Sequence, residues 1–258
     1  MSGEAILVAE NLSVQFGGVT AVDGVSLRAS VGEILGIIGP NGAGKTTLFN
    51  AMSGIVRPTR GSVSLSQVDV TGWPPHRIAG LGLTRTFQTP ETFWGMTVRE
   101  NVMVGFHQYS RVGLLAAGLS LGRVRRQEES WWQESTRLLA GSALAEAGDR
   151  LAEVLAFGQE RMLEIFRALA VRPRVLLLDE PLAGLNAAET VDVLGLVRRL
   201  RDEGVAVLLV EHDLQSLLAT ADRVMVLDHG RVIASGDPRS IRQDPAVRAA
   251  YIGDDDWD

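Results

Sequence analysis

Nine residues from Gly39 to Thr47, GPNGAGKTT, constrain the fold of this chain more than any other stretch. They fit the pattern G-x-x-x-x-G-K-[ST] and lie between an apolar run at 33–38 and a helix-like run at 48–53. Glycines let such a loop curl without Cβ clashes, so its amide groups and the following helix N-terminus form a cradle for anions. Lys45 adds a positive charge for the β- and γ-phosphates, and the Thr46 hydroxyl suits Mg²⁺. The stretch predicts a nucleotide-binding strand–loop–helix whose phosphate contacts are Gly39, Pro40, Asn41, Gly42, Ala43, Gly44, Lys45, Thr46 and Thr47.

Composition sets limits on the class of protein. The 258 residues are 46% hydrophobic and 22% charged, which is an ordinary globular composition with room for one large domain or two small ones. A net charge of −6 argues against nucleic acid as the main partner. The absence of cysteine excludes disulfides and cysteine metal sites. We expect no signal peptide and no span of about 20 apolar residues that would cross a bilayer.

The hydrophobic pattern predicts an α/β protein. Continuous apolar runs at 174–178 and 205–210 read as parallel strands that are buried on both faces. Alternating residues at 6–16 and 25–29 predict antiparallel strands, with turn signals at Gly17-Gly18 and Asp23-Gly24. Strands that alternate with helices bind ligands at the carboxyl ends of the strands. We therefore expect the glycine-rich loop, Asp179, Glu180 and His212 to meet at one sheet edge.

Helices are predicted in the middle and at the end of the chain. Thr97 and Glu100 form a capping box, and Asn186 with Glu189 three residues later marks another helix start. Residues 106–147 are helical in pattern and contain a basic cluster at 122–126. This cluster is either a solvated helix face or a contact for lipid headgroups or a membrane partner.

The polar residues at the strand ends suit phosphoryl transfer, which needs charge neutralisation, a metal and an oriented nucleophile. Thr46 and Asp179 suit the metal, and Glu180 is placed to polarise an attacking water. His212 either contacts the γ-phosphate or is a solvated residue at a helix start. Phe16 either stacks on adenine or is a half-buried strand aromatic.

The order GPNGAGKTT, Gln88, LAFGQ, LLLLDEP and His212 resembles an ABC-transporter ATPase over nearly the whole chain. The stretches TRTFQTPETFWGMTVRENVMVG, LAFGQERMLEIFRALA, LDEPLAGLN, VEHD and AYIG resemble the ATP-binding subunits of branched-chain amino-acid importers, the LivG type. The resemblance implies a P-loop NTPase fold with a RecA-like core sheet, an N-terminal antiparallel β subdomain and an α-helical subdomain. It implies one ABC ATPase domain over 1–258, with the helical subdomain inserted at about 89–172 and a helical tail at about 238–258.

The resemblance also assigns roles. Phe16 would stack on adenine, Glu180 would be the general base, His212 the switch histidine, and Gln88 part of the Mg²⁺ and lytic-water shell. Residues 155–159 would form the signature loop, which closes on ATP held by the opposite subunit. The loop at 89–96 would touch a coupling helix of the membrane partner. By this resemblance the signature-loop contacts to nucleotide are Ala156, Gly158 and Gln159, and the metal ligands are Thr46, Gln88 and Asp179.

Three residues depart from the general family pattern. Ala156 replaces the signature serine, Phe157 the next glycine, and Asn186 the usual aspartate after Glu180. Ala156 cannot donate a hydroxyl bond to a γ-phosphate, which weakens the site by about 1 kcal/mol or more. The Gly158 amide and the helix dipole remain available.

The resemblance implies an ATPase subunit of an importer for branched-chain or hydrophobic amino acids, peripheral on the cytoplasmic face of the inner membrane. Its cofactors would be ATP and Mg²⁺. Its partners would be membrane permease subunits, a second ATPase subunit and, indirectly, an extracytoplasmic solute-binding protein. Two alternatives stay open: a lipid or lipopolysaccharide exporter ATPase, and a non-transport ABC ATPase of translation or DNA repair.

Overall fold

The computed structural model describes residues 4–86, 92–109 and 121–251. The chain divides into two compact units, which are described separately. The first unit comprises 1–88, 174–183 and 193–258, and the second comprises 89–173 and 184–192.

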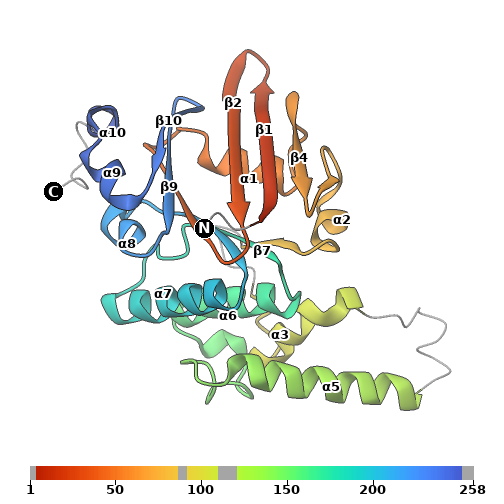
Figure 1. Cartoon of the computed structure of the whole chain (residues 1–258). Coiled ribbons are helices and arrows are strands. Elements are labelled where there is room, and N and C mark those ends of the chain that lie inside the picture. Colours follow the sequence, from red (N-terminus) through yellow and green to blue (C-terminus); the bar gives the residue numbers. More distant parts are fainter. Residues whose placement is uncertain (1–3, 87–91, 110–120, 252–258) are drawn as a thin grey trace. The chain divides into compact units, whose positions relative to one another are not determined.

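The first unit contains a four-stranded antiparallel sheet in the order β2-β1-β4-β5. Figure 1 shows β1 (Ala5–Phe16), β2 (Val19–Ser30) and β4 (Arg60–Leu65) side by side; β5 is Val68–Asp69. The predicted antiparallel strands are confirmed, but the turn predicted at Asp23-Gly24 is wrong. Gly24, with φ +65°, lies inside β2, where the pairing with β1 shifts by one residue. The glycine forms a bulge instead of reversing the chain.

The larger sheet of this unit has the order β10-β9-β3-β8-β7-β6. Five strands are parallel, and β10 runs antiparallel to β9. Every residue of β3, β7 and β8 is buried, which confirms that the continuous apolar runs are parallel strands. The strands are β3 (Ile34–Ile38), β6 (Leu83–Arg85), β7 (Val175–Asp179), β8 (Ala206–Val210), β9 (Arg223–Asp228) and β10 (Arg231–Gly236).

The two faces of this sheet are covered differently. On one face, alternate residues such as Leu35, Leu177 and Leu208 pack into a hydrophobic core. The inner residues of the small sheet and the buried face of α1 (Lys45–Met52) belong to the same core. On the opposite face Gly36 lies against Leu217 of α8 (Leu214–Leu218), which leaves no space for a Cβ atom. The other helices with residues in this unit are α2 (Pro75–Ala79), α7 (Ala187–Asp202), α9 (Pro238–Gln243) and α10 (Pro245–Ala250).

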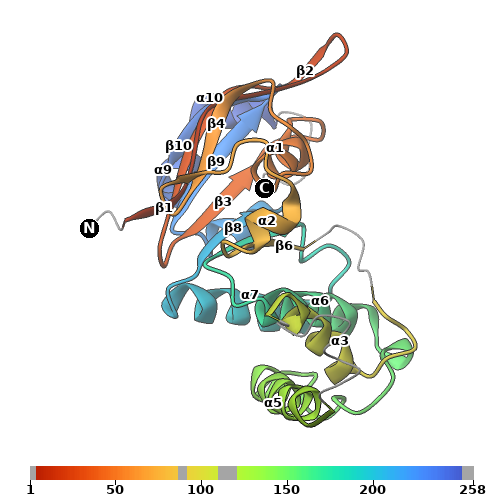
Figure 2. The same cartoon turned by 90° about the vertical axis from the view of Figure 1, so that its right-hand side faces the viewer.

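The second unit is helical. It contains α3 (Val98–Gly105), the 3₁₀ turn η1 (Phe106–Tyr109), α5 (Leu121–Leu139), the 3₁₀ turn η2 (Ala152–Val154), α6 (Phe157–Ala170) and the start of α7. Helix α3 contacts both α5 and α6 (Figure 2). The capping box at Thr97 is confirmed, and the Asn186 side chain accepts from the amides of Ala188 and Glu189. Among the described residues, no helix combines the length and the apolarity that crossing a membrane requires.

Candidate active site

Three neighbouring strands end at one edge of the larger sheet, and predicted site residues follow each of them. The glycine-rich loop follows β3, Glu180 follows β7, and His212 comes shortly after β8. These strands are adjacent and parallel, so the segments meet as expected. Between them lies a cavity of 290 Å³ lined by Ala21, Asn41, Gly42, Ala43, Gly44, Lys45, Thr46, Thr47, Glu180 and His212.

The loop needs glycine at specific positions. Gly39 has φ +154°, and a Cβ atom there would lie 2.0 Å from the carbonyl oxygen of Leu227. Gly44 has φ +101°, and its Cβ would lie 2.3 Å from the carbonyl oxygen of Ala21. Two backbone carbonyls from other elements therefore approach the loop so closely that only glycine fits at these two positions.

Lys45 begins α1 and turns its side chain back along the loop. Its ammonium group is buried and donates to the carbonyl of Gly39 and, at 3.2 Å, to that of Pro40. The charge is thus held at the centre of the amide-lined loop, where a phosphate group would be bound.

Glu180 and His212 are in direct contact, with His212 Nε2 2.6 Å from Glu180 Oε1. Glu180 adopts φ +52°, a left-handed conformation that is unfavourable for a residue with a Cβ atom. Its backbone N–H donates to the carbonyl of Val210 at 2.9 Å. Such strain is typical of positions where a side chain must be aimed.

Asp179 is buried beside a cation that the sequence did not single out. Arg85, on β6, places Nη2 2.7 Å from Asp179 Oδ2, and its Nη1 donates to the Asn50 side chain on α1. Burial raises the pKa of Asp179 above its ordinary value, while the Arg85 charge acts in the opposite direction. The sequence signal for this ion pair was an arginine in a short strand, β6, next to the strand that ends at the predicted metal ligand Asp179.

The second carboxylate oxygen of Asp179, Oδ1, is buried and has no hydrogen-bond partner. A buried carboxylate oxygen without a partner is energetically costly, so Oδ1 is suited to bind a cation. Oxygen donors such as this carboxylate and the Thr46 hydroxyl fit Mg²⁺, which keeps several water and phosphate ligands.

Glu211 is a second residue that the sequence did not identify. It is 3% exposed, and its Oε1 accepts from the backbone N–H of Leu182 at 2.8 Å. Burial raises the pKa of Glu211 to about 8, and the charges of Glu180 and Asp213 act in the same direction. A glutamate at the end of a fully apolar strand was the only sequence signal.

The predicted site also includes residues outside this group. Phe16 ends β1, is 51% exposed and does not contribute to the lining of the 290 Å³ cavity. Gln88 lies outside the described residues. Ala156, Gly158 and Gln159 belong to the second unit, so their part in nucleotide binding stays a prediction.

The signature loop begins α6 without a side-chain acceptor at its N-cap. Ala156 occupies that position with extended φ/ψ angles, and Gln159 Oε1 accepts from its backbone N–H at 3.1 Å. Phe157 is about half exposed, with the Arg161 guanidinium 5.3 Å from its ring centroid. A Cβ atom on Gly158 would lie 2.2 Å from the carboxylate carbon of Glu189.

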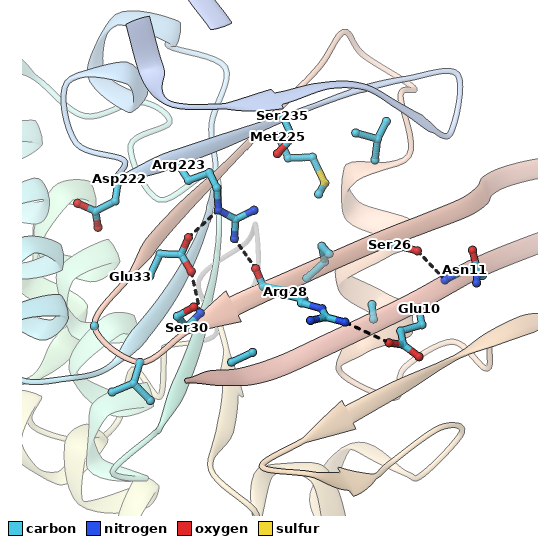
Figure 3. Close-up of a pocket in the computed structure, with 16 residues that line it drawn as sticks. Glu10, Asn11, Ser26, Arg28, Ser30, Glu33, Asp222, Arg223, Met225 and Ser235 are labelled. Carbon is cyan, nitrogen blue, oxygen red and sulfur yellow. Dashed lines mark hydrogen bonds and ion pairs between the residues drawn. The ribbon is translucent and has the colours of Figure 1, made fainter. Parts of the chain in front are cut away.

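A larger cavity of 1160 Å³ lies between the small sheet and the β9–β10 hairpin (Figure 3). Four of its charged side chains form two ion pairs: Arg223 Nε is 2.8 Å from Glu33 Oε1, and Arg28 Nη2 is 3.6 Å from Glu10 Oε1. This cavity has no glycine-rich amide cradle, so size alone does not identify the nucleotide site.

Comparison with known proteins agrees with the geometry. Residues 22–183 match the family model described as ABC transporter, and 231–256 match the model of the branched-chain amino acid ATP-binding cassette transporter. The chain is 41% identical over 250 residues to the high-affinity branched-chain amino acid transport ATP-binding protein BraF of Pseudomonas aeruginosa, covering 96% of this chain and 98% of BraF. It is 39% identical to LivG of Escherichia coli (97% and 99% covered) and 38% identical to the lipopolysaccharide export system ATP-binding protein LptB of Acidithiobacillus ferridurans (96% and 97%).

The solved structures support the same assignment. The ADP conformation of MJ1267, an ATP-binding cassette of an ABC transporter, has a TM-score of 0.85 and 34% identity, covering 97% of this chain and 100% of that one. A nucleotide-free cassette of an ABC transporter also has a TM-score of 0.85, with 33% identity and the same coverage. The match of residues 22–183 to the family model and the 41% identity to BraF over nearly the whole chain show that the chain belongs to the ABC transporter family, and it is one of that family's ATPases.

Proposed function

We propose that this chain is the ATP-hydrolysing subunit of an importer for branched-chain or other hydrophobic amino acids. The observation that carries the proposal is the pairing of Glu180 with His212 beside the phosphate loop. The solute class is supported by the match of residues 231–256 to the branched-chain family model and by the names of BraF and LivG.

The geometry supports a defined division of labour. Loop amides and Lys45 bind the phosphates, and Glu180 accepts a proton from the water that attacks the γ-phosphorus. The bond between that phosphorus and the β–γ bridging oxygen breaks, which releases ADP and phosphate. His212 holds the Glu180 carboxylate in place and lies beside the γ-phosphate.

Mg²⁺ would be held by Thr46, by Asp179 through Oδ1 and, by resemblance, by Gln88. When bound, it neutralises charge on the β- and γ-phosphates. Arg85 fixes the other carboxylate oxygen of Asp179 and so sets the direction in which Oδ1 points. Phe16, exposed at the end of β1, is available for stacking on adenine.

We also propose that the chain works against a second ATPase subunit and beneath membrane permease subunits. Phe93, Trp94 and Met96 are all more than a third exposed and form part of the loop assigned to the coupling contact. Exposed large apolar side chains that lie close together indicate a protein contact. We therefore propose a peripheral position on the cytoplasmic face of the membrane, with a solute-binding protein acting on the opposite face.

Reconstitution tests the proposal. The chain would be co-purified with the permease subunits and the second ATPase that the proposal requires, and placed in proteoliposomes with a branched-chain amino-acid-binding protein. We expect ATP-dependent uptake of labelled leucine, abolished by Glu180→Gln. ATPase activity stimulated by lipopolysaccharide without leucine uptake would instead support the exporter, and co-purification with ribosomes or DNA would support a non-transport role.

A further inference from the structure

Three consecutive residues at the end of β8 contact the turn that carries Glu180. The Val210 carbonyl accepts from the Glu180 N–H at 2.9 Å, and His212 Nε2 lies 2.6 Å from Glu180 Oε1. Between them, Glu211 Oε1 accepts from the Leu182 N–H at 2.8 Å. Of these three residues, Glu211 is the one whose side chain bonds to a backbone group of the turn.

This turn needs external support. Glu180 is held at φ +52°, and such a conformation persists only where the surroundings determine it. The next residue, Pro181, has no N–H group, so Leu182 provides the first amide beyond Glu180 that can be anchored. The Glu211 carboxyl group accepts from this amide and so anchors the turn.

Glu211 has no part in the chemistry described above, yet it is almost fully buried. A buried carboxyl group is costly unless its hydrogen bonds compensate for the lost water. It is faced by Glu180 and Asp213 and is adjacent to His212, so it lies among the groups of the active site.

We propose that Glu211 is a positioning residue, whose hydrogen bond to Leu182 fixes the turn that aims Glu180 at the attacking water. The inference rests on the proposed role of Glu180 as general base. The phosphate loop packs closely against the carbonyls of Leu227 and Ala21, which belong to other elements than this turn. Loss of the Glu211 contact should therefore affect turnover and leave nucleotide binding intact.

The test compares two substitutions at this position in the assembled transporter. Glu211→Gln keeps an acceptor oxygen for Leu182, and Glu211→Met removes it at similar volume. Displacing a catalytic group by about 1 Å costs on the order of 100-fold in rate, so we expect kcat to fall at least about tenfold in Glu211→Met. We expect Glu211→Gln to stay within about threefold of wild type, and the Kd for a fluorescent ATP analogue to change less than about twofold in both. Glu203→Met, at an exposed glutamate, is the matched control.

Amide hydrogen exchange at Leu182 in the full-length chain provides a readout that does not depend on activity. Protection should be lost in Glu211→Met and kept in Glu211→Gln. Wild-type kcat in Glu211→Met, or equal losses in both variants, would overturn the inference. Glu180→Gln, measured in the same assay, distinguishes failure of the proposed function from failure of this inference. An active Glu180→Gln would exclude Glu180 as the base. An inactive Glu180→Gln together with an active Glu211→Met would exclude only the positioning role of Glu211.

Discussion

The guanidinium of Arg85 lies 2.7 Å from the carboxylate of Asp179, and both side chains are at most 6% exposed. The pair joins β6, the strand that precedes Gln88 in the sequence, to β7, the strand that ends at Asp179. Because Arg85 also bonds to Asn50 on α1, the phosphate-loop helix and both strands share one cation.

Removing Arg85 should be strongly destabilising. In Arg85→Met, Asp179 keeps its buried carboxylate and loses its cation, so we expect the free energy of unfolding to fall by about 3–5 kcal/mol. The loss should become smaller as the pH is lowered, because protonation removes the charge that Asp179 would keep without its cation. Urea unfolding at pH 5 and pH 7.5 measures both effects. Arg231→Met breaks an exposed pair with Asp23 and should cost about 1 kcal/mol or less; equal costs for the two variants would contradict the prediction.

Glu180→Gln should reduce ATP turnover by roughly 10²–10⁴-fold, because the amide cannot accept the proton of the attacking water. The phosphate loop is untouched, so ATP affinity should remain near that of wild type. Steady-state ATPase assays and equilibrium binding separate the two effects. Turnover near the wild-type rate would remove Glu180 as the base.

Gly44→Ala should weaken nucleotide binding. The new Cβ would lie 2.3 Å from the Ala21 carbonyl at a left-handed backbone angle, which costs about 1–3 kcal/mol and distorts the cradle. We expect ATP affinity to fall about tenfold or more, since each 1.4 kcal/mol changes Kd by a factor of ten. The matched control is Gly195→Ala in α7, where the Cβ has open space; it should bind ATP normally and gain up to about 1 kcal/mol in stability.

Glu211 should make stability depend on pH. Its pKa is about 8 in the folded chain, against 4.5 ordinarily, so between these values the folded state holds a proton that the unfolded state has released. The contribution is fully present below pH 4.5, falls as pH rises and is lost above about 8, with a slope of at most roughly 1.4 kcal/mol per pH unit. Glu211→Gln should flatten the decline in unfolding free energy between pH 5.5 and 7.5, whereas Glu203→Gln should not. Identical slopes in all three proteins would show that Glu211 titrates normally.

Ala156→Ser should stabilise the start of α6. Ala156 has the extended backbone of an N-cap, and Gln159 already accepts from its N–H, so a serine hydroxyl would complete the capping box. We expect a gain of about 0.5–1 kcal/mol in thermal or urea unfolding, and a smaller change for Ala156→Gly. A serine variant no more stable than the glycine variant would show that the loop holds Ala156 in a geometry that a cap cannot use.

The parts of the fold predicted from sequence were those with strong local signals. The apolar runs of β7 and β8, the glycine-rich loop and the caps at Thr97 and Asn186 each follow from their own residues. The turn assigned to Asp23-Gly24 was wrong, because a glycine at positive φ serves a bulge as well as a turn. Arg85 and Glu211 could not be found, because their roles depend on partners 94 and 29 residues away in the chain.

The carboxylate of Glu189 has two neighbours at once. Its Oε2 accepts from the backbone N–H of Asn186 at the start of α7, and its Cδ lies where a side chain on Gly158 would begin. A methyl group at position 158 would displace the Glu189 carboxylate and so disturb its bond in the first turn of another helix. Gly158, at the start of α6, thus leaves the space that the Glu189 carboxylate occupies at the start of α7. The identity of residue 158 is therefore linked to that of residue 189.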